Sequence, residues 1–189
     1  MKTKICLLSL LLAASLPAGA GLYTSGPLPG TTIPNNTTLG TGSTLSYTFD
    51  HPADTVITDV VLTFALQGGV STDLSGYLRL GNNPDTSPHY DLTALIQSQS
   101  LSTLLATTYT IDFNTPGFHD AFNGLNPNDT WTLFFADTVN GDTTTVNSWS
   151  LDITAVPEPV NVAMAVFGVV VVAAGGVRRY LKARNAAPT

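Results

Sequence analysis

Apolar and polar side chains alternate with a period of two in six stretches in the middle of the chain. In each stretch the apolar positions point to one side of an extended strand, and Thr, Ser or Asp point to the other. The stretches are residues 45–49, 60–66, 74–80, 108–113, 131–136 and 149–153. Clusters of Gly, Asn, Pro and Asp separate them, at 68–69, 81–84, 114–117, 123–128 and 140–142. The pattern predicts an all-β domain, an antiparallel β-sandwich of jelly-roll-like form.

Two segments depart from the alternation. Residues 21–43 are rich in Gly, Pro, Thr and Asn with little apolar periodicity, which predicts an arm that lies on the surface or is flexible. We expect at most one edge strand in it, around Ile33, and place the sandwich itself at residues 44–155. The apolar residues of 92–105 come closer to helical spacing than to alternation. A strand over 92–96 followed by a loop fits almost as well, and both interpretations stay open.

The two tryptophans, Trp131 and Trp149, fall at inward positions of two late strands. Each can bury about 150 to 250 Å², so we expect them to dominate the core rather than to form a binding platform. Between their strands, Asn140 and Gly141 supply the left-handed backbone of a tight hairpin.

The first 20 residues form a separate segment. Lys2 and Lys4 precede an apolar run at 5–12, and the triplet that ends at Ala20 has the A-x-A form. This predicts a secretory signal peptide, residues 1–20, cut by signal peptidase after about Ala20. Cys6 is the single cysteine of the chain and leaves with the signal. The exported protein therefore has no disulfide, no thiolate metal site and no cysteine nucleophile.

The other end of the chain carries an uncharged apolar stretch. Residues 160–177 are 18 residues without a charge, about 27 Å long as a helix, which is just enough for a bilayer core. Arg178 and Arg179 follow at once, and two more cations lie by residue 184. The sequence thus predicts a single transmembrane helix with a cytoplasmic C-terminus and the preceding domain outside.

Directly before this stretch stand Val156, Pro157, Glu158 and Pro159. A Pro-Glu-Pro motif, one span and a short Arg-rich tail, together residues 156–184, resemble the PEP-CTERM sorting signal of exported bacterial proteins. The resemblance implies recognition by an exosortase, a membrane-embedded protease-transpeptidase, near 156–159. It also implies export through the inner membrane, transient anchoring by the C-terminal helix, and a final location at the cell surface or in an exopolysaccharide matrix. The two prolines favour an extended segment that an enzyme can read.

A second resemblance covers about residues 44–155. Residues 122–133 (FNGLNPNDTWTL), then Asp137, Gly141, Asp142 and residues 147–151 (NSWSL), are similar to the closing strands of the P domain. The P domain is the β-sandwich appended to proprotein convertases and many secreted bacterial subtilisin-like proteases. Upstream, 57–61 (ITDVV) and 73–78 (DLSGYL) resemble two earlier strands of that family. Ser71 and Thr72 stand where the family has a histidine, Asp129 and Thr144 where it has glycines, and no protease domain is present in this chain.

Charge is divided unevenly along the chain. The whole chain has a formal net charge of −6, yet the stretch between the two terminal segments carries twelve Asp against Arg79 alone. A domain of net −11 excludes a nucleic-acid partner, which needs a cationic face. Such a charge keeps an exported domain soluble and repels anionic polymers.

Few residues are candidates for metal binding or catalysis. Asp137, Asn140 and Asp142 place three oxygen ligands in one turn and are candidate ligands of Ca²⁺, although a solvated turn with hydrogen-bonding Asx side chains is the commoner case. His51, His89 and His119 show no zinc spacing, and no nucleophile motif accompanies them. We therefore expect a non-enzymatic structural or adhesive protein of the surface or matrix. The alternatives are a carbohydrate-binding module and, less favoured, a hydrolase.

Overall fold

The computed structural model describes residues 20–38, 41–50, 54–81, 83 and 86–185; within the last helix, several side chains are not described. Residues Ala20–Val156 form one compact unit, and the described residues from Pro157 onward belong to a second. The predicted signal peptide comprises residues 1–20. Residues 1–19 lie outside the described part, and Ala20 is exposed. The fold is therefore described below for each unit separately.

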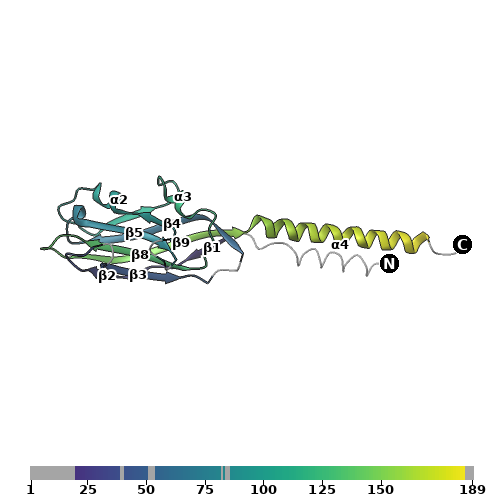
Figure 1. Cartoon of the computed structure of the whole chain (residues 1–189), viewed down its shortest axis with the longest axis horizontal. Coiled ribbons are helices and arrows are strands. Elements are labelled where there is room, and N and C mark those ends of the chain that lie inside the picture. The colour runs from purple at the N-terminus through teal and green to yellow at the C-terminus, as the bar shows by residue number, and fades with distance from the viewer. Residues whose placement is uncertain (1–19, 39–40, 51–53, 82, 84–85, 186–189) are drawn as a thin grey trace. The chain divides into compact units, whose positions relative to one another are not determined.

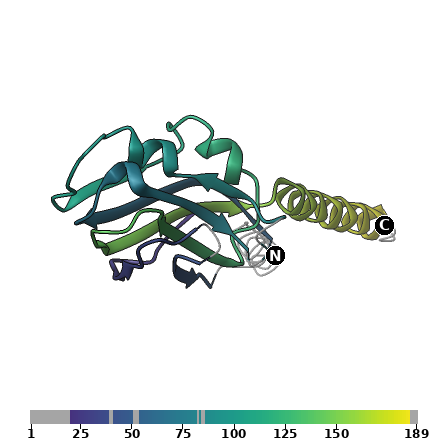
Figure 2. The same cartoon turned by 60° about the vertical axis from the view of Figure 1, so that its left-hand side comes forward.

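The first unit is a sandwich of two antiparallel sheets (Figure 1 and Figure 2). The five-stranded sheet contains β1 (Gly21–Thr24), β2 (Leu28–Ile33), β4 (Thr55–Gln67), β7 (Thr107–Ile111) and β9 (Thr144–Pro157). The four-stranded sheet contains β3 (Ser43–Thr48), β5 (Leu74–Leu80), β6 (His89–Asp91) and β8 (Thr130–Asp137). The strand orders are β1-β9-β4-β7, with β2 also pairing with β9, and β3-β8-β5-β6. These two antiparallel sheets confirm the predicted β-sandwich.

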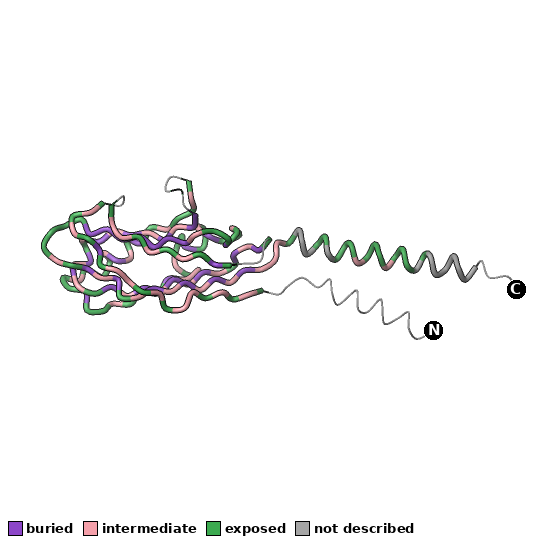
Figure 3. Tube along the Cα trace, turned by 90° about the horizontal axis from the view of Figure 1, so that it is seen from below, coloured by how far each residue is buried: buried purple, intermediate pink, exposed green. Residues whose placement is uncertain are grey.

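Apolar side chains from both sheets fill the space between them. Phe64 of β4 stacks on Tyr109 of β7 at 5.0 Å and meets Phe135 of the opposite sheet at 5.2 Å between ring centroids. Trp131 is fully buried and Trp149 is 3% exposed, so both belong to the core. Along β4 and β5, buried positions alternate mostly with half-buried ones, which is the pattern read from the sequence. Figure 3 shows buried and intermediate residues alternating along strands of the sandwich.

β8 departs from that alternation because every residue from Trp131 to Asp137 is buried. Trp131, Leu133 and Phe135 face the core, so Thr132, Phe134 and Ala136 face the other way. The strand lies between β3 and β5, and the Tyr77 ring of β5 stacks on Phe134. The sequence predicts Phe134 as an outward residue, and the structure shows that it is only 4% exposed.

The segment at 21–43 corrects the expected start of the sandwich. The strand expected around Ile33 is present as β2, and β1 adds a second one. Both pair with β9, from Gly21 opposite Ala155 to Ile33 opposite Thr144. Ile33 is fully buried in the core, so the sandwich begins at Gly21 rather than at residue 44. Backbone pairing with a long central strand here outweighs the weak apolar pattern.

Short helices occupy the connections. Residues 92–105 form α2 (Thr93–Gln97) and then a loop, and Leu92 and Ile96 on this segment are fully buried. The 3-10 turn η1 (Ser71–Asp73) precedes β5, and α3 (Phe118–Phe122) precedes β8. Phe122 of α3 lies 5.1 Å from the Trp131 ring, so α3 completes the core beside that tryptophan.

The prediction of a tight hairpin at Asn140 and Gly141 is wrong. β8 and β9 belong to different sheets, so the residues between them carry the chain from one layer to the other. Gly141 does have a φ of 127°, and the left-handed backbone expected in this turn is therefore present without a paired hairpin.

The second unit contains α4 (Pro159–Asn185), and the helical conformation expected at 160–177 is present. Most of its described large apolar side chains are exposed: Met164, Val166, Phe167, Val170, Val171 and Val172. Among the described residues, no helix is both long enough and apolar enough to cross a membrane, so the predicted span is not found there. The side chains of residues 160–162, 165 and 177 are outside the described set.

Candidate functional site

The predicted calcium ligands lie where the chain passes from β8 to β9. Asp137 is the last residue of β8 and is fully buried. Its Oδ1 accepts the backbone N–H of Val139 at 3.2 Å, and its Oδ2 accepts the Thr144 hydroxyl at 3.5 Å. The second of these contacts is at the outer limit for a hydrogen bond, so the carboxylate has weak compensation for its burial.

Two further carboxylates approach Asp137. Burial raises the pKa of Asp137 above its ordinary value, and the charges of Asp142 and Asp73 raise it further. The backbone N–H of Val139 and the hydroxyl of Thr144 act in the opposite direction on this pKa. Asp142 also has a buried Oδ2 without a hydrogen-bond partner among the described residues. This end of the sandwich therefore concentrates negative charge in a poorly solvated place.

The three predicted ligands do not share one environment. Asp137 is buried, Asp142 is half-buried and Asn140 is exposed. Asp73 of η1, which comes near Asp137, was not predicted because it is distant in the sequence and only the fold brings it there. Among the described residues, no group of three His, Cys, Asp or Glu side chains has a geometry that could hold a metal ion. Calcium binding at Asp137, Asn140 and Asp142 stays a prediction.

The histidines in the described part of the chain are exposed. His119 Nδ1 lies 3.1 Å from Asp120 Oδ1, and these two side chains are 47% and 88% exposed. The ring of His119 also meets Phe113 edge-on at 4.9 Å. In the described residues, no hydroxyl or thiol contacts the imidazole, so the pair lacks the nucleophile that a hydrolytic triad needs.

The residues of the predicted sorting motif lie at the end of the last strand. Val156 and Pro157 are the final residues of β9, Glu158 follows outside regular structure, and Pro159 begins α4. Pairing of β9 with β1 extends to Ala155, opposite Gly21. Regular pairing with β1 thus stops one residue before the motif. Arg178 is exposed on α4, and the side chain of Arg179 is outside the described residues.

Comparisons with known proteins give structural likeness only. No protein-family model and no curated protein sequence matches the chain. The serine protease of Aeromonas sobria is similar to it at 18% identity and a TM-score of 0.43, over 77% of this chain and 29% of the protease. A xylan-binding module, CBM15, is similar at 15% identity and a TM-score of 0.36, over 76% of this chain and 94% of the module. The chain thus spans less than a third of the protease that it matches.

Proposed function

We propose that the chain is an exported, non-catalytic β-sandwich protein, processed at both ends and held at the cell surface or in an exopolysaccharide matrix. There it has a structural or adhesive role. One observation carries the proposal: the compact unit Ala20–Val156 fills the stretch between the two predicted processing points. Signal peptidase would cut directly before the first strand, and an exosortase would cut at the end of β9, beyond the residues that pair with β1. Neither cut would remove a core residue of the sandwich.

The register of β1 and β9 supports the same proposal. Gly21, the first residue after the predicted signal cleavage, is the cross-strand neighbour of Ala155. The two processed ends would therefore emerge from adjacent positions at one end of the sandwich. Attachment there would leave the faces of both sheets and the opposite loops accessible to other components of the surface. The likeness of residues 122–151 to P-domain strands fits this two-sheet fold and belongs to the same proposal.

Fractionation of the native host with and without its sorting protease tests the proposal. We expect the processed domain outside the inner membrane in the first strain and a longer, signal-cleaved form in the inner membrane in the second. Replacing Pro157, Glu158 and Pro159 together by Ala should reproduce the second result in the first strain. Asp120→Asn, an exposed change far along the chain from the motif, serves as the matched control. Full-length protein retained in the inner membrane of both strains would overturn the sorting proposal.

A carbohydrate-binding module is the second candidate, and one observation favours it. Tyr77 and Phe134 form a stacked aromatic pair at 4.9 Å on the outer face of the four-stranded sheet. The sandwich core lies on the other face of this sheet, so core packing does not explain the pair.

A further inference from the structure

We propose that the outer face of the four-stranded sheet binds a neutral polysaccharide, which contacts the solvent-facing part of the Tyr77 ring and has Arg79 and Asp91 as its polar partners. This inference rests on the proposed surface role and supplies the ligand class for it. The strand register places eight outward side chains in two rows across β3, β8, β5 and β6. The first row is Thr44, Phe134, Tyr77 and Asp91, and the second is Ser46, Thr132, Arg79 and His89.

The aromatic pair in the first row is rigidly held. The rings of Tyr77 and Phe134 lie 4.9 Å apart with an angle of 11° between their planes. Phe134 is 4% exposed, and an added Cβ at Gly42 would lie 2.8 Å from its ring, so the backbone there covers it. Tyr77 is only half-buried and is thus the member of the pair that solvent can reach. A fixed aromatic ring offers apolar contact to the C–H side of a sugar ring at a low entropic cost.

The guanidinium of Arg79 lies over this ring. Its guanidinium carbon is 5.5 Å from the Tyr77 ring centroid, and its Nε donates to the carbonyl oxygen of Gly81 at 3.0 Å. Arg79 is the single Lys or Arg between residues 21 and 155, where there are twelve Asp. The one ion pair in the described part of the chain is nevertheless His119 with Asp120. Among the described residues, no acceptor is bound to the outer N–H groups of Arg79, and an external acceptor can use them.

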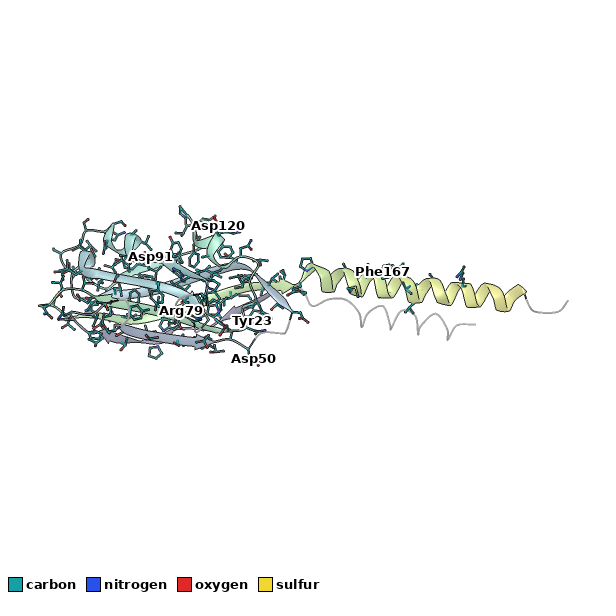
Figure 4. All side chains as sticks on the ribbon, viewed as in Figure 1. Tyr23, Asp50, Arg79, Asp91, Asp120 and Phe167 are labelled. Atoms are coloured by element: carbon teal, nitrogen blue, oxygen red, sulfur yellow. The ribbon has the colours of Figure 1, made fainter. Side chains whose placement is uncertain are left out.

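Asp91 supplies the complementary acceptor. Asp91 stands opposite Tyr77 on β6, while Arg79 stands one row away on β5. Arg79 and Asp91 are labelled in Figure 4. Oδ1 of Asp91 accepts the backbone N–H of Thr93 at 2.8 Å, which fixes the side chain, and the residue is exposed. A sugar hydroxyl both donates and accepts, so a carboxylate and a guanidinium on either side of an aromatic ring match adjacent hydroxyls of one sugar.

The charge of the unit decides between neutral and acidic polysaccharides. Arg79 and Asp91 cancel locally, and the stretch around them has a net charge of −11. A polyanion would be repelled by this field, whereas a neutral chain is indifferent to it. Thr44 and Ser46, which are exposed on β3, add hydroxyl groups to this face and no further charge. The occupant we infer is therefore an uncharged polysaccharide.

Binding of the full chain, purified in detergent, to immobilised polysaccharides tests the inference. The probes are dextran, galactomannan and arabinoxylan as neutral polymers and polygalacturonate as the acidic one. We expect saturable binding to at least one neutral polymer, unchanged by 0.5 M NaCl. Tyr77→Ala and Arg79→Gln should each weaken it about tenfold or more, as is usual for a central interface residue.

Matched variants distinguish loss of the binding site from loss of the folded structure. Tyr77→Phe keeps the ring and should retain most binding, and Asp91→Asn, which keeps the acceptor for Thr93, should weaken it. Thr110→Ala alters an exposed position of β7 on the other sheet and should change nothing. Absence of binding to all neutral probes, equal binding by Tyr77→Ala of unchanged melting temperature, or salt-sensitive binding to polygalacturonate alone would each overturn the inference. None of these outcomes bears on the fractionation result, so the two proposals fail separately.

Discussion

At the scale of single residues, Asp137 combines full burial with neighbouring negative charge. Its pKa is raised mainly by burial, so the folded state holds the proton more tightly than the unfolded state. The resulting stabilisation is complete below the unfolded pKa and is lost as the pH rises through the raised folded value. When it is ionised, the buried carboxylate therefore opposes folding.

Asp137→Asn should consequently stabilise the protein at pH 7. Asn can still accept the Val139 N–H, while the buried charge and its repulsion by Asp142 are removed. We expect the free energy of unfolding at pH 7 to rise by about 1 kcal/mol, and the gain to vanish at the acidic end, where the wild-type group is protonated. Urea unfolding of both proteins between pH 3 and 8 measures the difference. Asp120→Asn, at an exposed site, should leave the profile unchanged.

The same two proteins test the predicted calcium site. If an ion binds at Asp137 and Asp142, millimolar CaCl₂ should raise the melting temperature of the wild type, and Asp137→Asn should abolish that rise. In that case the variant would be less stable than the wild type in calcium at pH 7. A melting temperature that chelator and calcium both leave unmoved would instead support a solvated turn.

At the scale of elements, β2 depends on a close approach that only glycine allows. A Cβ added at Gly30 would lie 1.5 Å from the carbonyl oxygen of Val146, in the paired strand β9. Backbone cannot yield to such a contact as a flexible side chain can, so Gly30→Ala should separate β2 from β9 locally. We expect a loss of at least about 2 kcal/mol in the free energy of unfolding. Thr32→Ala, an exposed position of the same strand, should cost much less, and equal effects of both would contradict this account.

Much of the fold was predictable from the sequence because the core strands bury one face each. Leu62, Phe64 and Leu66 of β4 alternate with less buried residues, and such a pattern has only one structural solution. β1 and β2 were underestimated because their stability comes from pairing with β9, and pairing partners leave no local pattern. The proximity of Asp73 to Asp137, and of Tyr77 to Phe134, was not predictable for the same reason: both depend on register between distant strands.

At the scale of the whole molecule, net charge distinguishes the stages of the proposed processing. The full chain has a formal charge of −6, and loss of Lys2 and Lys4 with the signal peptide gives −8. Loss of Arg178, Arg179 and the two cations after them takes the product to −11, or −12 if Glu158 remains. The fold permits both cuts because the paired register of the sandwich begins at Gly21 and the pairing of β1 with β9 ends at Ala155.

Isoelectric focusing and intact-mass measurement of the product from the native host should therefore show an N-terminus near Gly21 and a C-terminus within 155–159. Its charge should lie well below that of the full chain. The strain without the sorting protease should yield the −8 form, which retains α4 and its exposed apolar side chains. A surface product that keeps the basic tail would show that the C-terminal segment is retained and not a sorting signal. A product cut within β9 before Ala155 would contradict the role of β1, because its pairing should shield that part of the strand from a protease.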